Sequence, residues 1–276
     1  MTLGPLLLLS FVAGVVGAMA GMGGGIVLIP ALTLAGEDIK RAIAVSMVSV
    51  IATSSGAASA YVRDHVTNLR VGMFLEMFTI VGALAGASIT AVSSGRWLYV
   101  LFGVVLLASW LTLWLQRGRP WQPPASQDGF SRWLALDGEY DDQALGRTVS
   151  YRATRAAIGG PCMAVAGLIA GLLGIGAGAL KVMIFDLVMG LPPKVSTTTS
   201  NLIIGVTALA GTSVYVASGL IDTRLAAPVI VGVTAGALVG TRILLRVSNE
   251  TVHGFFRIIL LVLGAEMIIR GIRSGR

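Results

Sequence analysis

Long apolar stretches alternate with short polar breaks along most of this sequence. The first half holds five such stretches, at residues 3–20, 25–35, 42–62, 71–92 and 97–116. Four of them are near the length of about 20 residues that a helix needs to cross a bilayer. The second stretch is short. The first and second stretches together are too long for one crossing of the bilayer and somewhat short for two. The pattern therefore predicts five membrane helices in this half, one of them short or unwound.

Composition indicates a polytopic membrane protein rather than a soluble domain. Of the 276 residues, 55% are hydrophobic and only 12% are charged, which leaves too few polar side chains for an ordinary soluble surface. The formal net charge of +7 suits the excess of Lys and Arg that membrane proteins carry on cytoplasmic loops, so we expect no nucleic-acid partner. A single cysteine, Cys162, excludes an intrachain disulfide.

Residues 117–152 are the one stretch of soluble composition, with three prolines and five acidic residues. We expect this stretch to be a cytoplasmic linker that joins a membrane repeat at residues 1–116 to a second membrane repeat at residues 153–276. Apolar side chains at Phe130 and Trp133 predict a short amphipathic helix in the linker, lying on the membrane surface.

The sequence after the linker repeats the first half. At an offset of 154 residues the following positions match: Ser46 and Ser200, Tyr61 and Tyr215, Arg70 and Arg224, Gly82 and Gly236, Gly86 and Gly240. Matches of these residue types in the same order indicate an internal duplication. Loop charges fit four or five helices per half equally well, and the lengths of the stretches favour five.

An odd number of helices per half, with the linker on one side, gives the second half the opposite orientation in the membrane. We therefore expect an all-α polytopic membrane protein made of two homologous halves of about five transmembrane helices each. The halves are expected to be inverted repeats with glycine-rich helix breaks.

Each half carries a glycine-rich motif inside an apolar run. The first copy reads Ala-Gly-Met-Gly-Gly-Gly-Ile-Val at residues 20–27, and the second reads Leu-Gly-Ile-Gly-Ala-Gly-Ala-Leu at residues 173–180. Glycines this dense weaken a helix and free the backbone, so both motifs predict helix breaks at membrane depth. Non-helical backbone persists there only where it is buried in protein or lines a wet cavity. The breaks should therefore mark a binding site or a path.

A small polar cluster follows each break after an apolar helix, at Ser46 in the first half and at residues 198–201 in the second. In this combination the chain resembles the sulfite exporter TauE/SafE family of bacterial membrane proteins, over both halves but not over the linker. The resemblance implies export of sulfite, a sulfonate or a related organosulfur anion across the bacterial inner (plasma) membrane. Two departures, Ala177 where the first copy has Gly24 and a poorer polar cluster in the first half, predict unequal half-sites.

The chemistry of the breaks suits an anion. Amides at a helix start, together with the positive end of the helix dipole, bind anions without a full cationic cage. Lys181 either adds attraction for the anion or extends toward the membrane interface, and the small polar side chains either donate to sulfonate oxygens or serve helix packing. The expected substrate-binding residues are Gly23, Gly24, Gly25, Ser46, Gly176, Ala177, Gly178, Lys181, Thr198, Thr199, Ser200 and Asn201.

Four charged residues fall inside apolar stretches, where an unpaired charge is costly: Glu76, Asp186, Arg257 and Glu266. Each is therefore expected to be paired or functional. One acidic residue is expected to carry a coupling proton, and spacing alone does not choose among them. The glycine pair at residues 82 and 86, like that at 236 and 240, has the spacing of close helix crossings.

Sequence signatures of enzymes do not appear: there is no HExxH, no nucleophile elbow and no P-loop. We expect no catalytic residue, cofactor or metal site. The expected function is secondary transport by alternating access, with a small sulfur-containing anion, a coupling proton or ion and the lipid bilayer as partners, and with self-association as a homodimer. An anion channel or a non-transporting membrane scaffold is the alternative.

Overall fold

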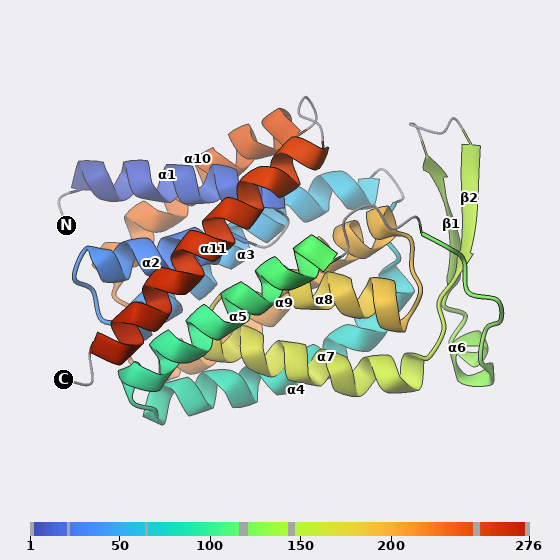
Figure 1. Cartoon of the computed structure of the whole chain (residues 1–276), viewed down its shortest axis with the longest axis horizontal. Helices are drawn as coiled ribbons and strands as arrows, with labels where there is room; N and C mark the ends of the chain where they lie inside the picture. The colour runs from blue at the N-terminus through green and yellow to red at the C-terminus, as the bar shows by residue number, and fades with distance from the viewer. Residues whose placement is uncertain are drawn as a thin grey trace.

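The computed structural model describes residues 3–20, 23–63, 66–115, 121–142, 147–244 and 249–273, and these are mostly helical (Figure 1). The helices of the first half are α1 (Leu3–Ala20), α2 (Gly25–Leu34), α3 (Ile39–Arg63), α4 (Leu69–Val92) and α5 (Gly95–Leu115). They follow the five apolar stretches of the sequence. The short member of the set is α2, which begins directly after the first glycine motif.

The second half shows the same order of long and short helices. Its elements are α7 (Ala156–Leu173), α8 (Gly178–Met183), the π-helix η1 (Ile184–Val188), α9 (Pro193–Ala217), α10 (Thr223–Leu244) and α11 (Asn249–Arg273). Within the described part of the chain, α4, α5, α7, α9 and α10 are long and apolar enough to cross a bilayer, and α1 and α2 are shorter apolar helices. Both glycine motifs interrupt helices, as predicted.

The linker contains the helix α6 (Gly129–Trp133) and two antiparallel strands, β1 (Asp137–Asp142) and β2 (Arg147–Arg152). The short helix is present where it was predicted, and its place on the membrane surface stays a prediction. The strands contradict the expectation of an all-α chain. The hairpin buries few side chains, so neither strand shows the clear alternation of apolar and polar residues by which a strand is predicted from sequence. Two that it does bury are Tyr140 and Tyr151, and the Tyr151 hydroxyl accepts a hydrogen bond from Asn68 Nδ2 at 3.0 Å. This bond ties the hairpin to the start of α4.

Asp128 fastens the linker helix to the start of the second half. Its carboxylate accepts hydrogen bonds from the Ser131 amide at 3.0 Å, which caps α6, and from the Arg155 amide at 2.6 Å. Slight burial disfavours the charged carboxylate, but the hydrogen bonds outweigh it and hold the pKa of Asp128 below its usual value. The linker is thus fixed to the helices on both of its sides.

Helices of the two halves interleave in the bundle. α4 packs along α7, α1 along α10, α5 against α11 and α3 against α9. Both termini lie at one end of the bundle, and the hairpin lies at the other (Figure 1). Large apolar side chains stay exposed on the outer faces, including Met77 on α4 and Val231 on α10. Such faces suit lipid, whose tails are as apolar as these side chains.

Glycines bring the paired helices into backbone contact. A Cβ atom at Gly86 of α4 would overlap the Leu168 carbonyl oxygen of α7, and one at Gly171 of α7 would overlap the Ala83 carbonyl oxygen of α4. In the same way, Gly236 of α10 abuts the backbone of α1. The predicted role of these glycines in close helix crossing is confirmed.

The contact between α4 and α7 predicts a large effect of Gly86→Leu. Backbone atoms cannot turn aside as a side chain can, so the substitution should destabilise the protein by about 3 kcal/mol. Thermal unfolding in detergent measures the change. Gly4→Leu is the matched control, since nothing lies within 4 Å of a Cβ there. Equal midpoints for the two variants would contradict the backbone contact.

Candidate functional site

The two glycine breaks meet inside the bundle. A Cβ atom at Gly25, the first residue of α2, would lie 2.6 Å from the Gly174 carbonyl oxygen in the second break and would overlap the Ser46 hydroxyl. The structure therefore brings Gly25, Ser46 and the second break into direct contact, although they are far apart in sequence. Only a residue without a side chain fits at this crossing point.

The backbone conformations of the two breaks differ. In the described residues of the first break, Gly23 has a left-handed φ of 75°, while Gly24 has an ordinary φ of −67°. In the second, Gly174, Gly176 and Ala177 have φ values of 66°, 68° and 49°. A left-handed alanine costs roughly 1 to 2 kcal/mol, so the second break is held in its shape by its surroundings. The two breaks therefore differ in backbone shape, and unequal binding half-sites stay a prediction.

Hydroxyl groups from three other helices satisfy the carbonyl oxygens at the second break. Gly171 O accepts from the Tyr215 hydroxyl at 2.5 Å, Leu172 O from the Thr90 hydroxyl at 2.8 Å, and Gly174 O from the Ser46 hydroxyl at 2.9 Å. The last carbonyls of a helix have no partner within that helix, and lipid offers none. These three bonds therefore compensate the negative end of α7.

The first i to i−4 hydrogen bonds of the following helices are donated by the Leu28 amide to the Gly24 carbonyl and by the Lys181 amide to the Ala177 carbonyl. The Val27 amide also bonds to the Gly24 carbonyl, at 3.2 Å. The earlier amides of each helix lie outside the repeating helical pattern. The positive end of the helix dipole lies at the same place. With the carbonyls satisfied, the polarity that remains at the breaks favours an anion.

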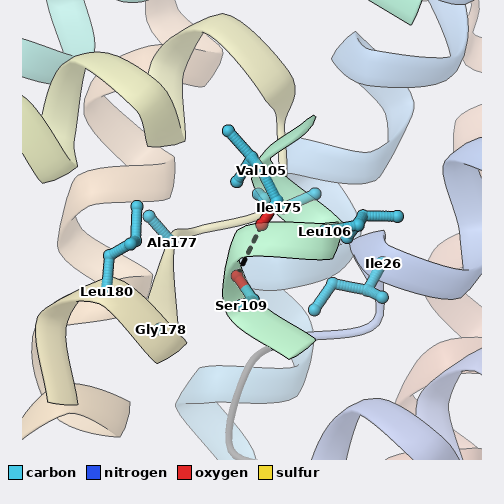
Figure 2. A pocket seen from close by; sticks show the side chains of 8 residues that line it. All are labelled: Ile26, Val105, Leu106, Ser109, Ile175, Ala177, Gly178 and Leu180. Atoms are coloured by element: carbon cyan, nitrogen blue, oxygen red, sulfur yellow. Dashed lines mark hydrogen bonds between the residues drawn. The ribbon is translucent and has the colours of Figure 1, made fainter. Parts of the chain in front are cut away.

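Two small hollows adjoin the breaks. The first, which we call the Ser109 hollow, is shown in Figure 2 and is lined by Ile26, Val105, Leu106, Ser109, Ile175, Ala177, Gly178 and Leu180. Its walls are mainly apolar, and the Ser109 hydroxyl donates to the Val105 carbonyl of its own helix at 2.8 Å. Residues at the starts of α2 and α8 thus share one cavity.

The second hollow, which we call the Asn201 hollow, is lined by Gly17, Ala18, Gly23, Thr53, Ser54, Asn201 and Ile204. It is more polar than the Ser109 hollow, because two hydroxyls and a carboxamide face one region. Gly23 belongs to the first break and Asn201 to the polar cluster of the second half. Two of the residues predicted for one site therefore do share a cavity.

The polar cluster of α9 is distributed over several neighbours. The Thr199 hydroxyl accepts from the Asn68 amide at 3.1 Å, and the Thr198 hydroxyl lies 3.3 Å from the Val66 carbonyl. Both hold the segment that precedes α4. Ser200 reaches the second break, donating to the Gly178 carbonyl at 3.4 Å. Consecutive residues point to different sides of a helix, so the four predicted residues do not form one cluster.

Lys181 lies in a buried charge pair and lines neither hollow. It is 0% exposed, and its Nζ atom lies 2.5 Å from Thr207 Oγ1 and 3.9 Å from Glu76 Oε2. The Glu76 carboxylate also accepts from the Thr207 hydroxyl at 2.7 Å and from the Thr79 hydroxyl at 2.6 Å. The pair joins α4, α8 and α9. Full burial contradicts the extension of Lys181 toward the interface, and its attraction for an anion stays a prediction.

The other three intramembrane charges have different surroundings. Glu266 pairs with Arg270, with 2.6 Å between Oε1 and Nε, and Arg270 also donates to the Thr33 carbonyl at the end of α2. Asp186 lies in η1, and its Oδ1 atom is buried with no hydrogen-bond partner among the described residues. The side chain of Arg257 lies outside the described residues.

Comparison with known proteins agrees with the resemblance seen in the sequence. Residues 6–267 match the family described as "Sulfite exporter TauE/SafE". The chain belongs to the TauE/SafE family. A relative in Bacillus subtilis (strain 168), named "Probable membrane transporter protein YunE", is 28% identical over 278 residues and covers 98% of each chain.

A second relative, "Probable membrane transporter protein YfcA" of Escherichia coli (strain K12), is 23% identical over 266 residues, which are 96% of this chain and 89% of its own. No solved structure gives a significant match. Membership of TauE/SafE makes the protein a multi-pass membrane transporter and not an enzyme, which confirms both expectations. The breaks therefore lie inside a transporter.

The buried pair predicts that Lys181→Met destabilises the protein. The substitution leaves Glu76 buried without a counter-ion, at a cost of about 3 to 5 kcal/mol. Adding Glu76→Gln keeps hydrogen bonds to Thr79 and Thr207 and removes the charge, so the double variant should regain most of the loss. Thermal unfolding in detergent of the single and double variants measures this. A stable Lys181→Met protein with weakened anion binding would instead favour direct contact with substrate.

Proposed function

We propose that this TauE/SafE protein is a secondary transporter that exports a small sulfur-containing anion, such as sulfite, a sulfonate or a related organosulfur anion. One observation carries the proposal. At the crossing of the two breaks, the carbonyls of Gly171, Leu172 and Gly174 are already bonded to hydroxyls. The starts of α2 and α8 lie beside these carbonyls, and amides at a helix start bind oxyanions. Membrane-embedded sites at broken helices are typical of secondary transporters.

Pairing of the helices supports two homologous halves, residues 1–116 and 153–276, separated by a cytoplasmic linker at 117–152. Taking α1 to α5 as equivalent to α7 to α11, the contact of α4 with α7 corresponds to that of α10 with α1. The contacts of α3 with α9 and of α5 with α11 join equivalent helices. Reciprocal pairing of this kind is what a two-fold axis between the halves produces, and an odd number of helices per half favours an axis in the membrane plane, as in inverted repeats.

Alternating access follows from such an arrangement. Rocking of the two bodies about the central crossing opens the site to one side of the bacterial inner membrane and then to the other. The direction of net transport follows the gradients of the anion and of any coupled proton or ion. Export is the direction that the family description names.

Counterflow of labelled sulfite in proteoliposomes tests transport by a carrier. Vesicles loaded with unlabelled sulfite should take up external label transiently, and the initial rate should saturate. Gly178→Val should abolish this uptake, because a branched side chain would fill the Ser109 hollow, while Gly4→Val should leave it unchanged. Unsaturated flux without counterflow would indicate a channel, and no flux at all would indicate a scaffold.

Inverted repeats also predict where labels reach the protein. In a variant lacking Cys162, a cysteine at Arg273 should react with an impermeant reagent applied from outside intact cells. A cysteine at Glu139 should react only after permeabilisation, because the linker is cytoplasmic and the two lie at opposite ends of the bundle (Figure 1). Both positions are exposed. Labelling of the two positions under the same condition would contradict the proposed topology.

A further inference from the structure

The Asn201 hollow contains a buried amide that has no partner. Asn201 is 4% exposed, and its carboxamide makes no hydrogen bond to any other described side chain or backbone group. Its side-chain atoms are not among the fully enclosed polar atoms that lack a partner, so they face the open space of the hollow, where an occupant can bond to them. Such a group inside a transporter, next to a glycine break, indicates a ligand that completes its hydrogen bonds.

The neighbours of Asn201 are suited to oxygen atoms. Thr53 and Ser54 are 2% and 5% exposed, and their hydroxyls bond to carbonyls of their own helix, at 3.0 Å to Val50 and 3.2 Å to Ile51. A hydroxyl hydrogen rotates freely, so each can turn from its helix to a bound oxyanion. The Asn201 carboxamide adds two N–H donors. Three side chains from two helices thus offer donors to one small region.

No charged side chain lines the Asn201 hollow among the described residues. Lys181, the buried cation of α8, is engaged by Glu76 and Thr207. The remaining positive contribution comes from the start of α2, which carries roughly half an elementary charge. Half an elementary charge compensates part of one negative charge, but only a small part of two. Because desolvation of an ion is costly, a doubly charged anion would be poorly stabilised in this hollow.

We propose that the Asn201 hollow binds the oxygen atoms of the transported anion and selects singly charged oxyanions, such as a sulfonate or hydrogensulfite, over doubly charged ones. This inference rests on the proposed transport function. The hollow in this form is about the size of a water molecule. An oxyanion therefore enters when α1, which supplies Gly17 and Ala18, moves away from α3 and α9.

The other half of the molecule supplies a natural comparison. Met47 holds the position equivalent to Asn201 at the offset of 154 residues. It is fully buried, and its methyl end packs against Gly211 of α9. An apolar side chain thus stands where the second half has the amide. The proposed oxyanion site therefore has no equivalent amide at Met47 in the first half.

Competition in wild-type proteoliposomes tests the choice of charge. Methanesulfonate should inhibit sulfite counterflow at concentrations at least about tenfold below those needed for sulfate. Between low and high pH, the apparent affinity for total sulfite should follow the fraction present as hydrogensulfite, while that for methanesulfonate should stay constant. Sulfate that competes as well as methanesulfonate would overturn the selection of a single charge.

Substitutions of Asn201 test the site itself. Asn201→Leu should raise KM for sulfite by about 10- to 100-fold, and Asn201→Asp, which adds a negative charge, should abolish uptake. Met47→Leu is the matched control and should leave KM unchanged. Asn201→Ser keeps one donor and should give an intermediate KM, which provides a second readout if the leucine variant fails to fold.

The outcomes separate this inference from the proposed function. Absence of counterflow in the wild-type protein would contradict transport of sulfite. Normal counterflow together with a wild-type KM in folded Asn201→Leu and Asn201→Ser proteins would leave transport standing and would place the oxyanion elsewhere.

Discussion

The structure depends on one constraint: a helix that ends inside an apolar layer must find partners for its last carbonyl groups. In helix α7 and the break after it, the carbonyls accept hydrogen bonds from the hydroxyls of Tyr215, Thr90 and Ser46, which belong to α9, α4 and α3. The break therefore organises the helices around it, because each donor fixes the position of its own helix. The same bonds occupy three carbonyls that lie beside the starts of the following helices.

A related constraint applies to charge. Lys181 and Glu76 are almost completely buried, and an ion in such a place needs both a counter-ion and hydrogen bonds. Thr207 and Thr79 supply the hydrogen bonds, so four residues form one neutral group between α4, α8 and α9. A group of this kind joins three helices beside the breaks and carries no net charge.

Much of the fold could be predicted from the sequence, because apolar stretches and glycine motifs are local signals. These local signals were enough to predict the helix breaks, the short α2 and the close helix crossings at glycines such as Gly86. The hairpin could not be predicted, because its strands are mainly polar and are held by a contact with Asn68. The partner of Lys181 lies more than 100 residues away in the sequence, and spacing gives no information on such a pair.

For the site, the sequence indicated residues 198–201 as a group, but the helical turn sends Thr199 toward Asn68 and Asn201 toward a hollow. The sequence analysis did not single out Thr53, which lines the Asn201 hollow, or Thr207, which contacts Lys181 and Glu76. The two threonines occupy equivalent positions at the offset of 154 residues, and this match could have indicated them.

The glycine contacts make the two halves of the chain depend on each other. Gly86 of α4 needs the backbone of α7, and Gly236 of α10 needs that of α1, so each half completes its packing only with a helix from the other. A half folded by itself would leave a groove of bare backbone facing lipid. Each half therefore depends on the other for cover along these helices, and the linker keeps that partner in the same chain.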